Sequence, residues 1–127
     1  MILFTDQSSN LSKQYFQILR PCHDEEIYGL IRVVKESCGG LYGFFSAHSS
    51  NSFAVAGFFY FSLTNSNRWR KFLFLWAAII AYSRVYCGVH FPSDVVIGGA
   101  YGLASGYLAS VFYNYLLKNY SFLSKSV

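Results

Sequence analysis

Residues 95–117 read VVIGGAYGLASGYLASVFYNYLL and contain no Asp, Glu, Lys or Arg. A helix needs about 20 mainly apolar residues to cross a bilayer, and this stretch meets that length outright. Small residues at every fourth position form a groove that lets a second helix approach closely. Here they are Gly98, Gly102, Gly106 and Ser110. The stretch therefore predicts a transmembrane helix that packs tightly against a neighbour.

Residues 41–67 and 72–83 are also free of charged side chains. The first stretch can span a bilayer if its polar start lies at the interface or faces other protein, and the second only by continuing through Arg84 to about residue 88. An arginine at that depth is expected to face a polar cavity rather than lipid. A chain of 127 residues is too small to hide three such stretches in a soluble core. We therefore expect an all-α transmembrane helical bundle with about three full spans.

A further helix is expected before these spans, because residues 11–19 carry apolar side chains at helical spacing. They are Leu11, Tyr15, Ile18 and Leu19. Residues 1–10 would form the inner part of this helix, but they are too polar and too short to span alone. We expect residues 1–127 to form a single domain that begins partway through a helix.

Composition excludes several classes of protein. Hydrophobic residues make up 54% of the chain and charged residues 13%, against about a quarter charged in an average soluble domain. This excludes a disordered chain and argues against a water-soluble domain. The net charge is +4, but the cations are scattered and no basic run alternates with aromatic residues, so nucleic acid is not an expected partner. Three cysteines without a CxxC pair predict neither a disulfide-rich scaffold nor a zinc site.

Basic residues set the expected orientation. Arg68, Arg70 and Lys71 lie between the first two spans, and Lys118 and Lys125 follow the last span. By the positive-inside rule, both groups face the cytoplasm. The opposite ends of the spans, with His48 and with the segment 84–94, then lie on the outer face. A multi-pass protein of the inner cell membrane, with its site on the periplasmic side, is the expected localisation.

Ionisable residues gather on this outer face in three clusters. Lys13 and Arg20 are seven residues apart, nearly two helical turns, so one helix is expected to present both on one face. His48 follows at the start of the first span. Arg84, His90 and Asp94 lie between the last two spans. Each residue alone has a structural explanation, such as an interface cation or a helix cap. Their convergence favours a functional site, because ionisable groups are expensive within membrane spans.

The chemistry that suits these residues is phosphoryl transfer. Three cations can neutralise the charge of a phosphoryl transition state without a metal. One histidine can attack phosphorus while the other protonates the leaving oxygen. Pro92 favours the first turn of a helix, which puts Asp94 just inside that helix and His90 just before it. Asp94 can then bind the Nδ1–H of His90 and orient the ring. Ser46 can cap the helix that carries His48.

Taken together, K-x6-RP, S-A-H and SR-x5-H-x3-D resemble the three-part signature of the type 2 phosphatidic acid phosphatases, the PAP2 superfamily. The chain is most similar to small bacterial membrane members that act on lipid phosphates. The resemblance implies a six-helix bundle like that of the vanadium haloperoxidases. Compared with that bundle, the first two helices and the inner half of the third are missing. Phe45 and Ala47 replace the proline and glycine that usually stand in the second part of the signature.

The resemblance also implies residue roles. His90 would form a phosphohistidine, oriented by Asp94, and His48 would act as general acid and then as general base. The expected phosphate-binding groups are Lys13, Arg20, Ser46, the Ala47 N–H and Arg84. Ser83 also matches the signature. No cofactor and no metal is implied.

The leading hypothesis is thus an enzyme: a phosphoric monoester or diphosphate hydrolase that acts on a lipid phosphate. The alternative is a catalytically inactive, truncated membrane protein that binds phospholipid or a partner subunit. A vanadate-dependent peroxidase is disfavoured, because those proteins are soluble. The expected partners are a phosphorylated lipid substrate and membrane lipid. The sequence identifies neither the lipid nor the oligomeric state, and a homo-oligomer is left open.

Cys22 and Cys38 lie in the same outer loop. In an oxidising compartment they could form a disulfide, worth about 3 kcal/mol in the chain-entropy model. Two free thiols are an equally good interpretation. His23 stands beside Asp24, Glu25 and Glu26, where a solvated acidic loop is favoured over a metal site.

Overall fold

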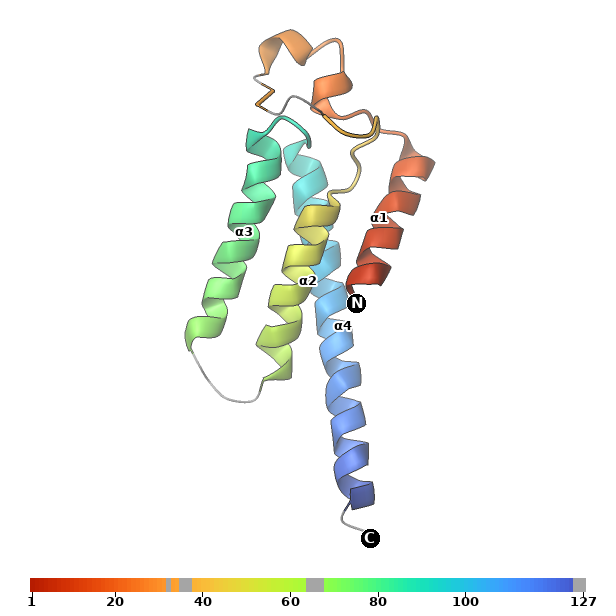
Figure 1. Ribbon diagram of the computed structural model, residues 1–127, viewed down its shortest axis with the longest axis vertical. Coiled ribbons are helices and arrows are strands. Elements are labelled where there is room, and N and C mark those ends of the chain that lie inside the picture. Colours follow the sequence, from red (N-terminus) through yellow and green to blue (C-terminus); the bar gives the residue numbers. More distant parts are fainter. Residues whose placement is uncertain (32, 35–37, 64–67, 125–127) are drawn as a thin grey trace.

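Four helices form the computed structural model, which describes residues 1–31, 33–34, 38–63 and 68–124 (Figure 1). The helices are α1 (Ile2–Phe16), α2 (Ala47–Ser62), α3 (Lys71–Tyr86) and α4 (Pro92–Ser124), with short 3-10 turns at Pro21–His23, Tyr28–Leu30 and Arg68–Arg70. The described residues contain no strand, only an isolated antiparallel bridge between Leu19 and Tyr42. The all-α prediction is confirmed.

The helix pair α2 and α4 forms the centre of the bundle, with α1 and α3 on either side (Figure 1). Glycines allow this close approach. A Cβ atom added to Gly102 would lie 2.0 Å from the carbonyl oxygen of Ser50, and one added to Gly106 would lie 2.3 Å from that of Ala54. The backbones of the two helices are therefore in direct contact, as the small-residue spacing predicted.

Polar groups at both ends define the bounds of α2. Ser46 caps the start of the helix, because its side chain accepts a hydrogen bond from the Ser49 N–H at 3.4 Å. At the far end, the guanidinium group of Arg70 donates to the carbonyl oxygens of Tyr60 and Leu63. These carbonyls have no partner within the helix, so Arg70 satisfies acceptors that the end of α2 leaves open.

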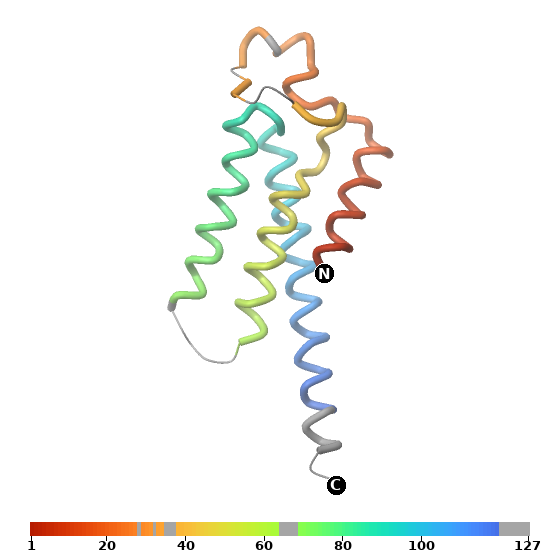
Figure 2. Tube along the Cα trace, viewed as in Figure 1, coloured from red at the N-terminus to blue at the C-terminus, as the bar shows by residue number. Residues whose placement is uncertain are grey.

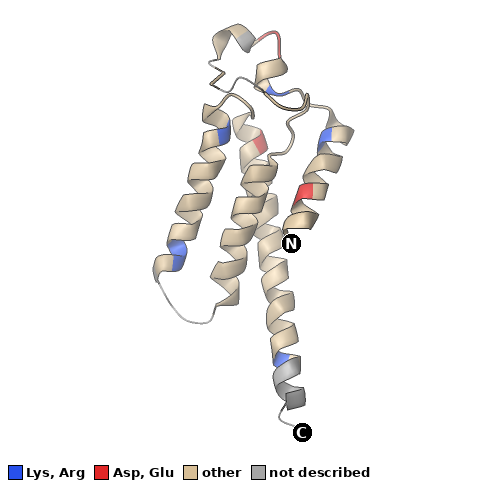
Figure 3. Cartoon of the chain, viewed as in Figure 1, with Lys and Arg blue, Asp and Glu red and all other residues tan. Residues whose placement is uncertain are grey.

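Only α4 among the described helices is both long and apolar enough to cross a membrane, over Pro92–Asn119. The helices α2 and α3 have 16 residues each, or about 24 Å of length. Their outward side chains are nevertheless large and apolar, with Phe72 56% and Ile79 61% exposed. Figure 3 shows that α2 and the middle of α4 carry no charge. The multi-pass topology stays a prediction.

The expected helix over residues 11–19 ends early. α1 stops at Phe16, and Gln17 takes a left-handed conformation with φ 50° and ψ 33°. Arg20 then lies in extended backbone, with φ −73° and ψ 152°. The prediction that one helix face presents both Lys13 and Arg20 is therefore wrong. Figure 2 follows the chain from α1 into the long loop between α1 and α2. This loop lies at the end of the bundle where α1 ends and α2 begins.

Candidate active site

A cavity of about 550 Å³ lies at this end of the bundle, where α1, α2, α3 and the long loop meet. Most of the predicted site residues line it, although they come from distant parts of the sequence. They are Lys13, Arg20, Ala47, His48, Arg84 and His90. Ser46 and Asp94 are fully buried beside the cavity wall. The structure thus brings the predicted residues together, while their chemical roles stay predictions.

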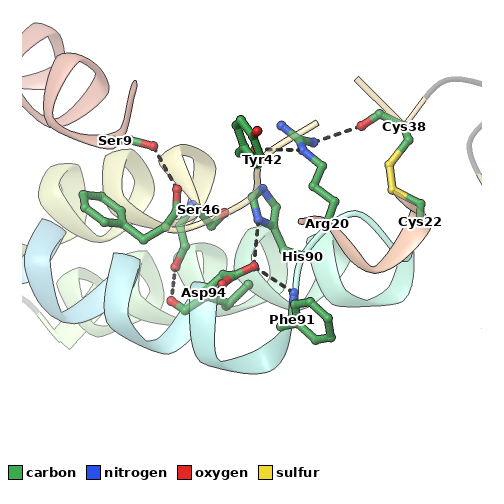
Figure 4. A network of polar contacts seen from close by, with 12 residues as sticks. Ser9, Arg20, Cys22, Cys38, Tyr42, Ser46, His90, Phe91 and Asp94 are labelled. Atoms are coloured by element: carbon green, nitrogen blue, oxygen red, sulfur yellow. Dashed lines mark hydrogen bonds and ion pairs between the residues drawn. A yellow bond between two sulfur atoms is a disulfide. The ribbon is translucent and has the colours of Figure 1, made fainter. Parts of the chain in front are cut away.

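His90 and Asp94 form a buried pair at the start of α4, with 4% and 1% of their surfaces exposed. Nδ1 of His90 lies 3.4 Å from Oδ2 of Asp94. The same carboxylate oxygen accepts a hydrogen bond from the Phe91 N–H at 3.0 Å (Figure 4). Asp94 is therefore fixed at the first turn of α4. It can hold the imidazole ring through Nδ1, which leaves Nε2 as the nitrogen available to a ligand.

The turn between α3 and α4 brings His90 to this position. Gly88 has a positive φ of 69°, a conformation that glycine adopts readily. The Val89 N–H donates to the Arg84 carbonyl oxygen at 3.2 Å, and α4 begins at Pro92. Burial lowers the pKa of His90, as does the Arg20 cation, while the hydrogen bond with Asp94 raises it. Burial dominates, so the pKa lies below its ordinary value and the ring is largely neutral near pH 7.

The start of α2 is fixed against α4 and α1. The Ser46 N–H donates to the Asp94 carbonyl oxygen at 3.1 Å, and the Ser49 hydroxyl donates to that of Val95 at 2.7 Å. From α1, the Ser9 hydroxyl donates to the Phe45 carbonyl oxygen at 2.8 Å. These bonds hold the first turn of α2, and with it His48, at the cavity. The backbone N–H groups in the first turn of a helix point toward its start and favour an anion there.

Arg20 reaches the cavity from the extended segment after α1. Its Nε donates to the Tyr42 carbonyl oxygen at 3.2 Å, and its Nη1 donates to that of Cys38 at 3.0 Å (Figure 4). Lys13 lies in the last turn of α1, where the Gln17 N–H closes the helix on its carbonyl oxygen at 3.1 Å. The left-handed turn at Gln17 therefore directs both cations to one cavity, although they do not share a helix face.

Arg84 completes the set of three cations from the last turn of α3. Its Nε donates to the Ser83 hydroxyl at 3.2 Å, and that hydroxyl donates to the Ile80 carbonyl oxygen at 2.7 Å. This gives Ser83 a defined part in the site: it holds the guanidinium group of its neighbour. Arg84 thus lines the same cavity as Lys13 and Arg20, and its position relative to lipid stays a prediction.

Two further residues belong to the site. Asp6 lines the cavity from α1, and its position seven residues before Lys13 is a helical spacing that could have indicated a shared face. Gly43 lies between the arginine and the His90–Asp94 pair. A Cβ atom at Gly43 would lie 3.1 Å from Cγ of Arg20 and 3.2 Å from Oδ2 of Asp94. No local signal distinguishes Gly43 from the other glycines of this loop.

The cysteines of the outer loop are joined. The structure places a disulfide between Cys22 and Cys38, whose Cα atoms are 6.3 Å apart (Figure 4). Cys22, His23 and Cys38 also bring potential metal-ligand atoms within 4.8 Å of one another. A metal there would need both thiols reduced, because a disulfide leaves no thiolate to bind it. Oxidation of this pair in the purified protein stays a prediction.

Comparisons with known proteins agree with this geometry. A family model described as the PAP2 superfamily matches residues 1–118. A protein of Porphyromonas gingivalis named lipid A 4'-phosphatase is 34% identical over 120 residues, which cover 90% of this chain and 48% of that protein. A protein of the same name from Bacteroides thetaiotaomicron is 37% identical over 110 residues, covering 84% and 48%. The chain thus spans about half the length of these curated relatives. No solved structure gives a significant match.

Proposed function

The chain belongs to the PAP2 superfamily, and on that premise we propose that it is a membrane phosphatase that hydrolyses a phosphorylated lipid. The observation that carries the proposal is the convergence of two histidines and three cations on one cavity. Each of these residue types meets a need of phosphoryl transfer, namely a nucleophile, an acid and compensation of charge.

His90 is the proposed nucleophile. Its Nε2 attacks phosphorus while the bond from phosphorus to the lipid oxygen breaks, which leaves a phosphohistidine. Asp94 holds Nδ1 at 3.4 Å and stabilises the positive charge that forms on the ring. The lowered pKa of His90 supports this role, because only the neutral imidazole has a lone pair for attack.

His48 is the proposed general acid and base. In the first step it gives a proton to the lipid oxygen that leaves. In the second step it takes a proton from water, whose oxygen attacks phosphorus and breaks the bond to His90. Inorganic phosphate is then released. Its place in the first turn of α2, at the same cavity as His90, supports this alternation.

The three cations are proposed to bind the phosphate oxygens, so that the reaction needs no metal. Arg20 and Arg84 offer forked donors that match a phosphate, and Lys13 adds a point charge. The Ala47 N–H at the start of α2 adds a backbone donor. Phosphate release is therefore expected to persist in a chelator.

A lipid substrate fits the surroundings of this cavity. A neighbouring cavity of about 480 Å³ shares Asp6, Ala47 and His48 with it and continues between Val55 and Ile80. A polar end and an apolar wall suit an amphiphile whose phosphate is held near His48. The names of the two relatives make a lipid A phosphate the first substrate to test. We place the site on the periplasmic face of the inner membrane, following the basic residues at the opposite ends of the spans.

The experiment is phosphate release from lipid A, phosphatidate and a polyprenyl diphosphate by the purified chain, in detergent with EDTA. His90→Ala is expected to lower release by about 10³-fold or more while the variant still folds. Rapid quenching with ³²P-labelled substrate should trap a protein-bound phosphate that is labile in acid and stable in alkali. Release by His90→Ala at the parent rate would refute the mechanism. Lipid phosphate binding without turnover would instead support the non-catalytic alternative.

A further inference from the structure

Among the residues that the structure describes, backbone carbonyl groups and no acidic side chain hold the Arg20 guanidinium group. It donates to two carbonyl oxygens, those of Cys38 and Tyr42, at 3.0 and 3.2 Å (Figure 4). A guanidinium group has five N–H donors. Two of them bind residues that the structure describes, and Arg20 also lines the cavity. These two bonds therefore set the direction in which the other donors face a phosphate.

The backbone that carries Arg20 is paired with the segment that holds it. The Arg20 N–H donates to the Leu41 carbonyl oxygen at 3.1 Å, and the Gly43 N–H donates to that of Ile18 at 2.9 Å. Gly43 continues this pairing into the site, since its Cβ position lies 3.5 Å from Nδ1 of His90. Movement of residues 38–43 would thus displace Arg20 relative to the nucleophile.

The disulfide ties these two segments together at their other end. Cys22 follows Arg20 by two residues, and Cys38 supplies the carbonyl oxygen that binds Nη1. The bond therefore links the backbone of the arginine to the backbone of its acceptor. The two cysteines are 16 positions apart in the sequence. Without the bond, the contacts of the described residues that keep the Cys38 carbonyl at the guanidinium group are the hydrogen bonds of Arg20 and the pairing of residues 18–20 with 41–43.

We propose that the Cys22–Cys38 disulfide is a positioning element of the phosphate site, which fixes Arg20 through the Cys38 carbonyl, so that phosphate affinity depends on the oxidation state of these two cysteines. The inference rests on the proposed function, since it takes the cavity to be the phosphate site. Reduction by a dithiol breaks the S–S bond. The dithiol supplies two electrons and two protons, which give two thiols, and is itself oxidised to a disulfide.

The test is the affinity of the full chain for inorganic phosphate, measured by titration calorimetry in detergent before and after dithiothreitol. EDTA is present throughout, because the freed thiols and His23 have metal-ligand spacing. Reduction is expected to weaken phosphate binding about 10-fold, the effect of losing one well-placed charged hydrogen bond. With lipid substrate, KM should rise by a similar factor while kcat changes less.

Two variants show whether the effect passes through Arg20. In Arg20→Ala, dithiothreitol is expected to have no further effect, as for two changes that act through one group. The double variant Cys22→Ala/Cys38→Ala should bind phosphate as weakly as the reduced parent. Dithiothreitol should not change its phosphate affinity. It retains Cys87, the third cysteine, and so controls for reduction elsewhere.

Three results would overturn the inference. The first is that a thiol reagent labels all three cysteines without reductant, and the second is that phosphate affinity stays unchanged after the disulfide is opened. The third is that dithiothreitol weakens phosphate binding by Arg20→Ala as much as binding by the parent. Because dithiothreitol acts on the folded parent, the test does not depend on folding of the double variant. Redox-dependent phosphate binding without lipid hydrolysis would uphold the inference and refute the proposed function. Failure of the oxidised parent to bind phosphate would refute both.

Discussion

At the scale of single residues, the proposed chemistry depends on the pair His90 and Asp94. Four positions separate them, so the first turn of α4 places the carboxylate beside Nδ1. The Phe91 N–H holds the same carboxylate oxygen at 3.0 Å. The proposed reaction then needs little rearrangement to orient the His90 ring, because the backbone already fixes the Asp94 carboxylate.

The variant Asp94→Asn removes the negative charge beside His90 but keeps a side chain of the same shape. It therefore separates the effect of that charge from the orientation of the His90 ring. Asp94 raises the pKa of His90 through its hydrogen bond and its charge, while burial lowers it. Removal of the carboxylate therefore lowers this pKa further. Since the neutral ring reacts, the acid limb of kcat/KM should move to lower pH, while kcat falls about 10²–10⁴-fold. The pH profile with lipid phosphate measures both, and an acid limb that moves upward would contradict the assignment.

At the scale of elements, contact between α2 and α4 determines whether the site can assemble. The Ser46 end of α2 lies against the first turn of α4, and a Cβ atom at Gly98 would lie 2.6 Å from the Ser46 carbonyl oxygen. The His48 turn and the His90 turn are therefore adjacent because the glycine face of α4 admits the backbone of α2. A wider separation of these helices would move the proposed acid away from the proposed nucleophile.

Gly102→Ala tests this contact. The added Cβ would lie 2.0 Å from the Ser50 carbonyl oxygen, so the helices must separate. We expect the free energy of unfolding to fall by about 1–3 kcal/mol, although alanine favours a helix more than glycine does. Unfolding in detergent, followed by circular dichroism, measures the change. The control is Ala104→Leu on the exposed face of the same helix, expected within about 0.5 kcal/mol of the parent. Equal effects of the two variants would argue against tight packing.

At the scale of the whole molecule, the distribution of charge gives the bundle two different ends. The cavity end holds Lys13, Arg20 and Arg84 around a site that a phosphate can neutralise. At the opposite end, where α3 begins and α4 ends, Lys71 and Lys118 are exposed. In the part of the chain that the structure describes, neither lysine forms an ion pair, and such cations fit the cytoplasmic side of a membrane.

Labelling from either side of the membrane tests this orientation. Gly29 in the outer loop has no atom within 4 Å of its Cβ position, and Asn119 near the end of α4 is exposed. In cells with a permeable outer membrane, an impermeant maleimide should label Gly29→Cys directly. Asn119→Cys should react only after the inner membrane is opened. The reverse pattern would place the site in the cytoplasm.

The sequence alone determined the helical class and the PAP2 signature, and it predicted most of the charged residues and histidines that line the cavity, but not Asp6. These features are local: hydropathy and helical spacing act over one or two turns, and the signature residues stand at fixed intervals. The SAH segment and the H-x3-D segment each lie at a helix start, where a cap or a proline fixes the backbone.

Only the tertiary structure decided how Arg20 reaches the site and what holds it there. The sequence favoured a continuous helix through Leu19, whereas the chain leaves the helix at Gln17 and pairs residues 18–20 with residues 41–43. The contact of Gly43 with Arg20 and Asp94 also depends on that pairing. Contacts between segments some 20 residues apart depend on which of several alternative packings has the lower free energy. The conformational propensities of neighbouring residues do not predict that difference.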